Sequence, residues 1–342
     1  MNQRTLIMVA VLAIVAISAA LLQPRDKYES GEVSEVFLPG LREQANELNG
    51  LGLYTGGGVP IGQFSRVDDR WISSNPAGYP ADWDNIRELI ASLAEASVIE
   101  IKTANPDYYD RLGVRDTSDP EAAGVRVDLA SETTTWSAII GMSAESRQGQ
   151  YARIPGEPAS VLLDQEISLS LDPIGWLEQD IVNLPAAEVA SVTIEHPDGV
   201  VIHISKNSPA DSDYVLSDVP EGQTARTGYT VNAIAAGLAS LEMQEVRATD
   251  GIDFSGSSTA RFECFDGRVV TARLIKVDEK AWISLGAEYS SPADGTEATD
   301  AEALGWVERL NSAKSAWVFA LPDYKFDVLS REFEELLESA DE

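Results

Sequence analysis

The pattern of apolar and polar residues repeats in two stretches of the chain, residues 82–101 and 227–246. In each stretch apolar residues recur three, four and seven positions apart, which is the period of one face of an α-helix. We therefore predict that each stretch forms a helix that leads directly into a strand. The matched residues, related by one constant offset, are Ile86, Leu89, Leu93 and Val98 in the first stretch and Val231, Ile234, Leu238 and Met243 in the second.

Acidic residues stand where the first of these helices is expected to begin. The carboxylate of Asp82 can accept hydrogen bonds from the unpaired backbone N–H groups of the first turn. Asp84 and Glu88 add negative charge near the positive end of the helix dipole. A pair such as Asp82 and Asp84 also suits a metal ion, but capping explains it more simply. We therefore assign Asp82 a structural role as the N-cap.

Short runs of alternating or β-branched residues predict strands around both helices. Residues 61–73 are expected to form a hairpin with Asp68 and Asp69 at its turn. Further strands are predicted at 97–103, 125–129, 135–142, 149–154 and 160–164 in the first half, and at 191–195, 200–204, 260–265, 269–277, 281–285 and 316–319 in the second. Helical segments are expected at 301–310 and, as a closing amphipathic helix, at 324–339.

The hairpin predicted at 191–204 has the most specific signal. We expect a three-residue loop with Gly199 in the left-handed conformation. The strand pairs that this loop sets are Val192 with Ile204 and Ile194 with Ile202. The same register places the two histidines, His196 and His203, on opposite faces of the hairpin. Each histidine is therefore interpreted as structural or solvated rather than as a metal ligand.

Together these elements predict an α+β protein with two tandem, structurally similar units of mostly antiparallel sheet, each with a packed helix. The predicted ranges are 41–183 and 184–342, with an acidic insertion at about 286–315 in the second unit. Residues 27–40 lack a clear period and are predicted to be a tether. The core positions of the helices are assigned to Leu89, Leu93, Ile234 and Leu238.

Residues 6–22 form an uncharged apolar run near the N-terminus. At about 1.5 Å per residue this run gives roughly 25 Å of helix, and Thr5 and Gln23 extend it toward the ~30 Å hydrocarbon core of a bilayer. We predict a transmembrane signal-anchor within residues 1–26 that contacts the membrane through residues 5–23. The alternative is a signal peptide cleaved after Ser18 or Ala20. The anchor predicts a single-pass protein of the inner (cytoplasmic) membrane with a periplasmic C-terminal body.

The chain carries 56 Asp and Glu residues against 25 Lys and Arg residues, and its formal net charge is −31. Because such a surface repels phosphate backbones, nucleic acid is not an expected partner. The single cysteine, Cys264, cannot form an intramolecular disulfide, and it shares a strand face with Phe262 as a small apolar residue. The sequence contains no phosphate-binding loop and no catalytic or metal-ligand motif, so we expect no cofactor.

Several short motifs follow one another in a specific order. They are Arg70-Trp71-Ile72, Ala81-Asp82, Tyr109-x-x-Leu112-Gly113-Val114, Ile140-Gly141, Tyr151-Ala152-Arg153, Trp176-Leu177 and Trp317-Val318-Phe319-x-Leu321-Pro322. With the apolar N-terminal helix, this order resembles the family catalogued as domain of unknown function 4340. The resemblance implies a single-span exported protein, often encoded beside ABC-2-type transporter subunits and a gliding-motility-type auxiliary protein. The resemblance assigns no catalytic residues to this chain. The insertion at 286–315 departs from the family pattern.

Three functions follow as hypotheses. The first is a non-enzymatic, membrane-anchored accessory protein that acts outside the cytoplasm with a transporter permease or an envelope complex. The second is a binding module for an envelope sugar or peptide, with Tyr108, Tyr109 and Trp136 as its candidate contact surface, although packing in the core also explains these aromatic residues. The third is a hydrolase with two carboxylates about 5–9.5 Å apart, one of them with a raised pKa.

Overall fold

The computed structural model describes residues 32–145, 149–226, 228–290 and 300–338. Backbone contacts divide the chain into two units. The first comprises Met1–Asn75 and Trp83–Trp176, and the second comprises Pro76–Asp82 and Leu177–Glu342. The predicted ranges, 41–183 and 184–342, place the boundary later and assign residues 76–82 to the first unit. The structural similarity of the two units to each other stays a prediction.

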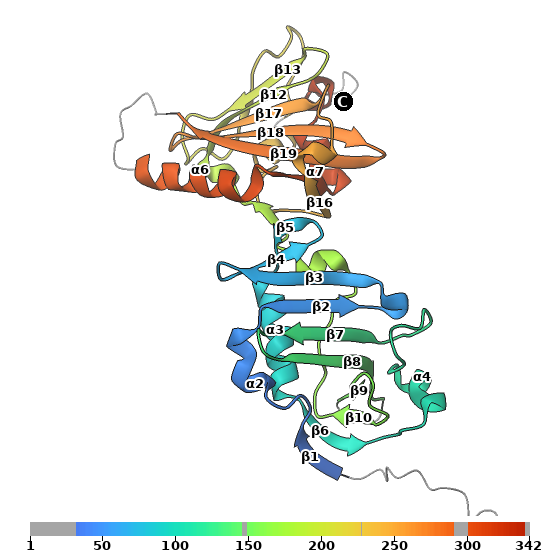
Figure 1. The fold of residues 1–342 in the computed structure, drawn as a ribbon. Helices are drawn as coiled ribbons and strands as arrows, with labels where there is room; N and C mark the ends of the chain where they lie inside the picture. The colour runs from blue at the N-terminus through green and yellow to red at the C-terminus, as the bar shows by residue number, and fades with distance from the viewer. Residues whose placement is uncertain (1–31, 146–148, 227, 291–299, 339–342) are drawn as a thin grey trace, which may run out of the picture. The chain divides into compact units, whose positions relative to one another are not determined.

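One large antiparallel sheet makes up most of the first unit (Figure 1). Its strands, in chain order, are β1 (Glu32–Val36), β2 (Gly50–Tyr54), β3 (Pro60–Val67), β4 (Arg70–Ser74), β6 (Ser97–Ile101), β7 (Val125–Ala130), β8 (Thr135–Ser143), β9 (Gln150–Arg153) and β10 (Ser160–Leu163). Across the sheet they lie in the order β1-β6-β10-β9-β8-β7-β2-β3-β4, and each neighbouring pair is antiparallel. The five strands predicted after the first helix are therefore confirmed.

The hairpin of β3 and β4 closes through a two-residue turn, as predicted. Val67 pairs with Arg70, and the two residues between them, Asp68 and Asp69, have φ angles of 48° and 62°. Two consecutive left-handed residues match the twist of the flanking strands, and aspartate tolerates this conformation better than most residues. The turn chemistry therefore sets the register of the hairpin.

Helix α3 (Trp83–Glu95) covers one face of this sheet and buries the residues that the sequence pattern selects (Figure 1). Ile86, Leu89 and Leu93 are 0%, 1% and 0% exposed. Burial of each such side chain contributes about 1.5–3 kcal/mol to folding. The other helices of this unit in the described residues, α2 (Leu41–Gln44) and α4 (Tyr109–Leu112), are single turns.

The prediction of a tether at residues 27–40 is wrong for its second half. β1 pairs with β6 at an edge of the sheet, and the next two residues, Phe37 and Leu38, are 4% and 3% exposed. Strand pairing satisfies backbone N–H and C=O groups whatever the side chains are. A short edge strand therefore forms here without the alternating pattern that a sequence-based prediction depends on.

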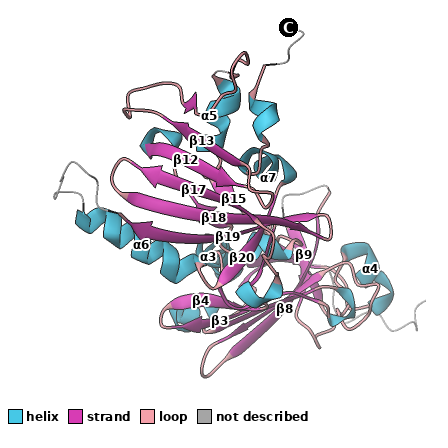
Figure 2. Ribbon diagram, turned by 90° about the horizontal axis from the view of Figure 1, so that it is seen from above, coloured by secondary structure: helices cyan, strands magenta, loops and turns pink. Residues whose placement is uncertain are grey.

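The second unit also contains a large antiparallel sheet (Figures 1 and 2). Its strands are β12 (Val189–Glu195), β13 (Val201–Ser205), β14 (Val215–Leu216), β16 (Glu245–Ala248), β17 (Ser258–Cys264), β18 (Arg268–Val277), β19 (Lys280–Tyr289) and β20 (Trp317–Leu321). They lie in the order β14-β13-β12-β17-β18-β19-β20-β16, and neighbours pair antiparallel. The other strands of this unit are β5 (Ala77–Pro80), β11 (Asp180–Val182) and β15 (Leu241–Glu242). The six strands predicted for this half are confirmed.

Three helices belong to the described part of the second unit: α5 (Tyr229–Ala235), α6 (Asp300–Lys314) and α7 (Asp323–Leu329). α6 confirms the helix predicted at 301–310 and lies alongside β19 (Figures 1 and 2). The helix predicted at 324–339 is wrong in its extent, because α7 ends at Leu329 and a 3₁₀ turn, Phe333–Leu336, follows. At the break the Ser330 hydroxyl donates a hydrogen bond to the Phe326 carbonyl oxygen (2.8 Å), which satisfies a carbonyl at the helix end.

Helix α5 is shorter than its predicted counterpart α3. Gly237 follows it, and a Cβ atom at this position would lie 2.3 Å from Cδ2 of Leu329. Glycine allows this close approach but is a poor helix former. The predicted face is buried all the same, since Val231, Ile234 and Leu238 are 1%, 0% and 0% exposed. The apolar spacing therefore identifies the buried face correctly even where the helix is short.

The β12–β13 hairpin has the predicted register and loop. Its strand pairs include Val192 with Ile204 and Ile194 with Ile202. The loop closes through a hydrogen bond from the His196 N–H to the Val200 carbonyl oxygen (2.9 Å), and Gly199 has a φ of 89°. Both histidines have hydrogen-bond partners within the second unit. His203 Nδ1 lies 3.0 Å from the Thr193 hydroxyl, and His196 Nε2 lies 3.0 Å from the Arg331 carbonyl oxygen.

Cys264 is buried, as predicted, with 7% of its surface exposed. Burial raises the pKa of its thiol to about 12. Because the thiolate is the reactive form, we expect the native protein not to react with 5,5′-dithiobis(2-nitrobenzoate) at pH 8 and to release one thionitrobenzoate per chain once it is unfolded in urea. Rapid stoichiometric reaction of the native protein would contradict the burial of this thiol.

The described elements are mostly antiparallel strands with a few helices, so the α+β class is confirmed. The predicted N-terminal transmembrane helix lies outside the described residues. Within the described residues, no helix combines the length and the apolar character that a membrane span requires.

Candidate functional site

The predicted structural residues lie at the start of α3 and within it, in α5 and just after it, and in the β12–β13 loop. Asp82 directly precedes α3, which is the position of an N-cap residue. Asp84 lies in the first turn of α3 and forms an ion pair with Arg87 at 3.0 Å. No cluster of three metal-ligating side chains of the His, Cys, Asp or Glu type occurs in the described part of the chain.

The three aromatic residues of the candidate contact surface are not all exposed. Tyr108 is 45% exposed, but Tyr109 and Trp136 are only 7% and 8% exposed. The indole N–H of Trp136 donates a hydrogen bond to the Pro39 carbonyl oxygen at 3.0 Å. Two of the three residues therefore pack inside the first unit, because their rings gain more from burial and from internal hydrogen bonds than from exposure.

Tyr109 instead joins two distant segments of the first unit. Its hydroxyl donates a hydrogen bond to the Pro158 carbonyl oxygen at 2.5 Å. The guanidinium carbon of Arg153 lies 4.7 Å from the centre of its ring, which is a cation–π contact. Burial raises the pKa of the Tyr109 hydroxyl, so this group is a hydrogen-bond donor at neutral pH.

Arg153, at the end of β9, is the buried residue on which this region is built. Its Nε donates a hydrogen bond to the Val114 carbonyl oxygen at 2.9 Å, and its Nη1 donates to the Glu157 carbonyl oxygen at 3.1 Å. The side chain of Arg153 is 6% exposed, and its Nη2 lies 3.9 Å from the nearer carboxylate oxygen of Asp116. One arginine thus ties together β9, the loop after it and the segment after α4.

Three glycines allow α4 and the strands beneath it to approach closely. Gly113 ends α4 with a φ of 68°. A Cβ atom on Gly141 would lie 2.3 Å from the Leu112 carbonyl oxygen, and one on Gly124 would lie 2.2 Å from the Gly113 carbonyl oxygen. Any larger residue at these two positions would push the backbone of α4 away from the sheet.

An open pocket of about 710 Å³ lies over this region. Its charged lining residues are Asp107, Asp110, Arg115, Asp116, Asp119, Arg153 and Glu157. Negative charges therefore outnumber positive charges by three in the lining. The volume is within the usual range for small-ligand pockets, but the lining contains more charged residues than such pockets usually have.

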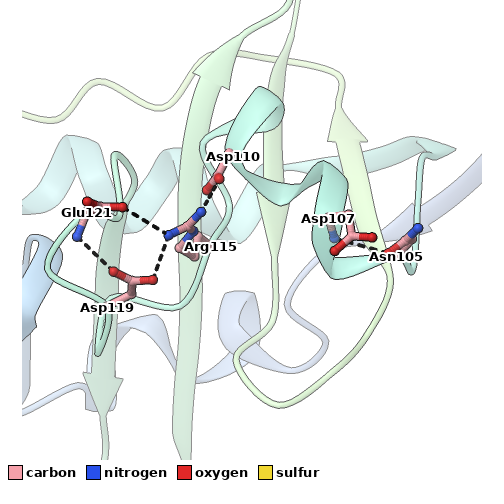
Figure 3. Close-up of polar contacts among 6 residues, drawn as sticks. All are labelled: Asn105, Asp107, Asp110, Arg115, Asp119 and Glu121. Carbon is pink, nitrogen blue, oxygen red and sulfur yellow. Dashed lines mark hydrogen bonds and ion pairs between the residues drawn. The ribbon is translucent and has the colours of Figure 1, made fainter.

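The carboxylates on one side of the pocket are engaged by Arg115 (Figure 3). Its guanidinium contacts Asp110, lies 2.7 Å from Asp119 and lies 3.7 Å from Glu121. Figure 3 shows Arg115 between Asp110 on one side and Asp119 and Glu121 on the other. The hydrogen bonds to Asp110 and Asp119 raise the pKa of Arg115, so it stays charged.

Comparison with protein families gives a match at this point in the chain. A family model described as Domain of unknown function (DUF4340) matches residues 71–257. The chain belongs to the DUF4340 family. The matched region includes the whole pocket described above. Comparison with curated proteins and with solved structures gave no significant match.

Motifs that carry the resemblance to DUF4340 proteins meet around Tyr109 and Arg153, two lining residues of this pocket. Tyr109 lies against Arg153, the backbone of Val114 accepts from Arg153, and Gly141 lies under the backbone of Leu112. These residues come from three separate motifs in the sequence. The motifs therefore have a structural basis in this protein: they hold α4 on the sheet and bury the arginine.

The polar residues of the pocket were not predicted as a site from the sequence. Short local turns position several of them: Asp119 Oδ1 accepts from the Glu121 N–H at 2.9 Å, and Asp116 Oδ1 accepts from the Ser118 N–H at 3.1 Å. Such turns are readable in the sequence Asp116-Thr117-Ser118-Asp119-Pro120 as a loop signal. The proximity of these turns to Arg153 cannot be read from the sequence, because Arg153 lies on a strand that is far away along the chain.

Hydrogen bonds hold these carboxylates in the charged form. The Ser118 N–H lowers the pKa of Asp116, and the Glu121 N–H together with Arg115 lowers the pKa of Asp119. Among the described residues, every carboxyl group whose pKa departs clearly from its ordinary value has it lowered. Asp116 and Asp119 are therefore fixed carboxylates near neutral pH.

The lowered pKa of Asp116 predicts a pH-dependent stability. The unfolded chain binds a proton to this carboxyl near its ordinary value of 3.8, whereas the folded chain does so only at lower pH. The stabilisation is therefore complete above that value and is lost as the pH falls through the folded pKa. We expect Asp116→Asn to be less stable than the parent at neutral pH by under about 1 kcal/mol, because the carboxylate is half-exposed.

This difference should disappear as the pH falls through the folded pKa of Asp116, since the parent carboxyl is then protonated as well. Urea denaturation of the parent and of Asp116→Asn across this pH range measures it. Asp250→Asn, at an exposed position of the second unit, is the matched control for loss of one negative charge. A stability difference that does not shrink as the pH falls below 3.8 would contradict the assignment.

Proposed function

We propose that this DUF4340 protein is a non-enzymatic, membrane-anchored accessory protein that acts outside the cytoplasm, in association with an ABC-2-type transporter permease or an envelope complex. In this proposal residues 5–23 anchor the chain in the inner membrane, and the two described units form its periplasmic body. The pocket around Arg115 and Arg153 is the proposed contact site.

One observation favours a role in binding a partner over a role in catalysis. The two arginines of the pocket already bind other groups of the protein: Arg115 binds carboxylates, and Arg153 donates through Nε and Nη1 to backbone carbonyl oxygens. A carboxylate-dependent hydrolase needs one carboxylic acid with a raised pKa beside a second carboxylate. The pocket carboxyls Asp116 and Asp119 have lowered pKa values, which suits permanent charges that recognise a partner.

The second hypothesis is a binding module for an envelope sugar or peptide. The structure bears differently on these two kinds of ligand. Sugar binding by an aromatic platform loses its support, because Tyr109 and Trp136 are buried. Peptide binding is favoured by the open, polar pocket with its excess of carboxylates. Binding of a peptide segment is also compatible with the accessory role, since a partner protein supplies such a segment.

The accessory role is tested by photocrosslinking in the native membrane. A photoreactive residue at position 108, which is exposed beside the pocket, is expected to crosslink the full chain to a permease subunit. The matched control carries the photoreactive residue at position 229, which is 89% exposed in the second unit. Absence of a permease from the position-108 products, with the chain recovered from the soluble cytosol, would refute the proposal.

A further inference from the structure

The floor of the pocket contains a hydrogen-bond donor that the described part of the protein does not use. Arg153 is one of the lining residues although its side chain is 94% buried, and Nη2 makes no hydrogen bond to the described residues. The carboxylate that forms an ion pair with it, Asp116, has an oxygen at 3.9 Å, which is beyond hydrogen-bond range. Nη2 is not one of the fully buried polar atoms without a partner, so it is accessible from the pocket and available to an acceptor atom supplied from outside.

Two carboxylates of the same pocket have no guanidinium group of the described residues within hydrogen-bond distance. Asp116 has only the distant contact to Arg153, and Asp107 forms no ion pair within the described residues. Figure 3 shows Asp107 on the opposite side from the Arg115 cluster, and the contact drawn for it is that of its backbone N–H with Asn105. The pocket thus offers two negative charges beside one donor.

We propose that this pocket binds an extended, basic segment of a partner polypeptide. A backbone carbonyl oxygen of the segment accepts from Arg153 Nη2, and a lysine or arginine side chain of the segment lies against Asp116 and Asp107. The inference rests on the proposed accessory function and names the chemistry of its contact. A free anion is disfavoured by the surrounding carboxylates, whereas a polypeptide brings a neutral acceptor and a cation together.

The pairing of donor and carboxylates separates this proposal from attraction by overall charge. With a net charge of −31, the protein attracts any basic peptide weakly and without a specific site. If binding depends only on overall charge, removal of any one carboxylate weakens peptide binding by the same small amount. Arg153 then only repels the basic peptide. In a specific complex Asp116 outweighs a remote carboxylate, and the geometry of the Arg153 guanidinium matters at constant charge.

The test measures binding of fluorescent peptides to the purified full chain by anisotropy at physiological ionic strength. The probe is an acetylated and amidated Gly-Ser peptide with three arginines, and the control peptide has glutamine in place of each arginine. We expect Asp116→Asn to weaken binding of the arginine peptide about fivefold and Asp250→Asn to leave it within about twofold. Arg153→Lys, which keeps the charge but loses the planar fork, is expected to weaken binding about tenfold.

Equal effects of Asp116→Asn and Asp250→Asn would overturn the proposal, as would equal binding of the arginine and glutamine peptides. So would unchanged binding by a folded Arg153→Lys variant. If Arg153→Lys melts at a lower temperature than the assay, Asp116→Asn decides the test alone. Photocrosslinking separates the two proposals: a permease that crosslinks to the parent and to Asp116→Asn alike refutes the pocket contact only, and a parent that captures no permease refutes the accessory function.

Discussion

Replacing Gly141 by alanine is expected to lower the free energy of unfolding by about 3 kcal/mol, which is at the upper end of the usual cost of overpacking. The new Cβ atom would lie 2.3 Å from the Leu112 carbonyl oxygen and 2.8 Å from Cγ1 of Val114. The first of these is a backbone atom of α4, so no side-chain rotation relieves the clash. Urea denaturation followed by circular dichroism measures the change.

The matched control is Gly286→Ala. Gly286 also lies within a strand, β19, but a Cβ atom there would have nothing within 4 Å. Because alanine loses less conformational freedom than glycine on folding, this variant is expected to be neutral or more stable by up to about 1 kcal/mol. Similar stabilities of Gly141→Ala and Gly286→Ala would show that α4 does not pack on β8 as described.

The elements that were predictable from the sequence depend on neighbours in the chain. Helix α3 has a strong 3.6-residue period, and the hairpin at Gly199 has a loop that allows only a few conformations. The cysteine was placed correctly because a strand alternates its faces, so burial of Phe262 implies burial of Cys264. Local rules of this kind give both the type of an element and the face that it buries.

The parts that were not predictable depend on contacts between distant residues. Residues 76–82 continue directly from β4, and their assignment to the first unit seemed natural from the chain order. Yet the ring of Tyr79 packs edge-on against the ring of Trp317, with 5.1 Å between the ring centres. The Tyr79 hydroxyl donates a hydrogen bond to the Glu178 carbonyl oxygen at 2.8 Å. These partners lie far away in the sequence, so no pattern within residues 76–82 identifies the unit to which they belong.

The same limit applies to the candidate site. The aromatic pair Tyr108 and Tyr109 looks alike in the sequence, but one is exposed and the other supports Arg153. A one-turn helix places adjacent residues on different faces, and only the position of β9 decides which face is covered. The pocket therefore becomes visible only when the segments around 109, 115 and 153 are brought together.

Substitution of Leu93 by aspartate is expected to be among the most destabilising changes in the first unit, and Leu238→Asp in the second. Both leucines are 0% exposed. Removal of such a side chain alone costs about 2–5 kcal/mol, and a carboxylate in the same place adds the penalty of an unpaired buried charge. We expect more than about 4 kcal/mol for each variant, measured by thermal and urea denaturation of the full chain.

The controls place the same charge on exposed positions beside the same helix faces: Ala91→Asp in α3 and Tyr229→Asp at the start of α5. Surface changes of this kind usually alter stability by less than about 0.5 kcal/mol, apart from the lower helix propensity of aspartate. If Leu93→Asp and Leu238→Asp melt like the parent, both helix faces are misassigned. If only Leu238→Asp is tolerated, the two stretches share an apolar spacing without sharing its structural role, and the prediction of an internal repeat is wrong.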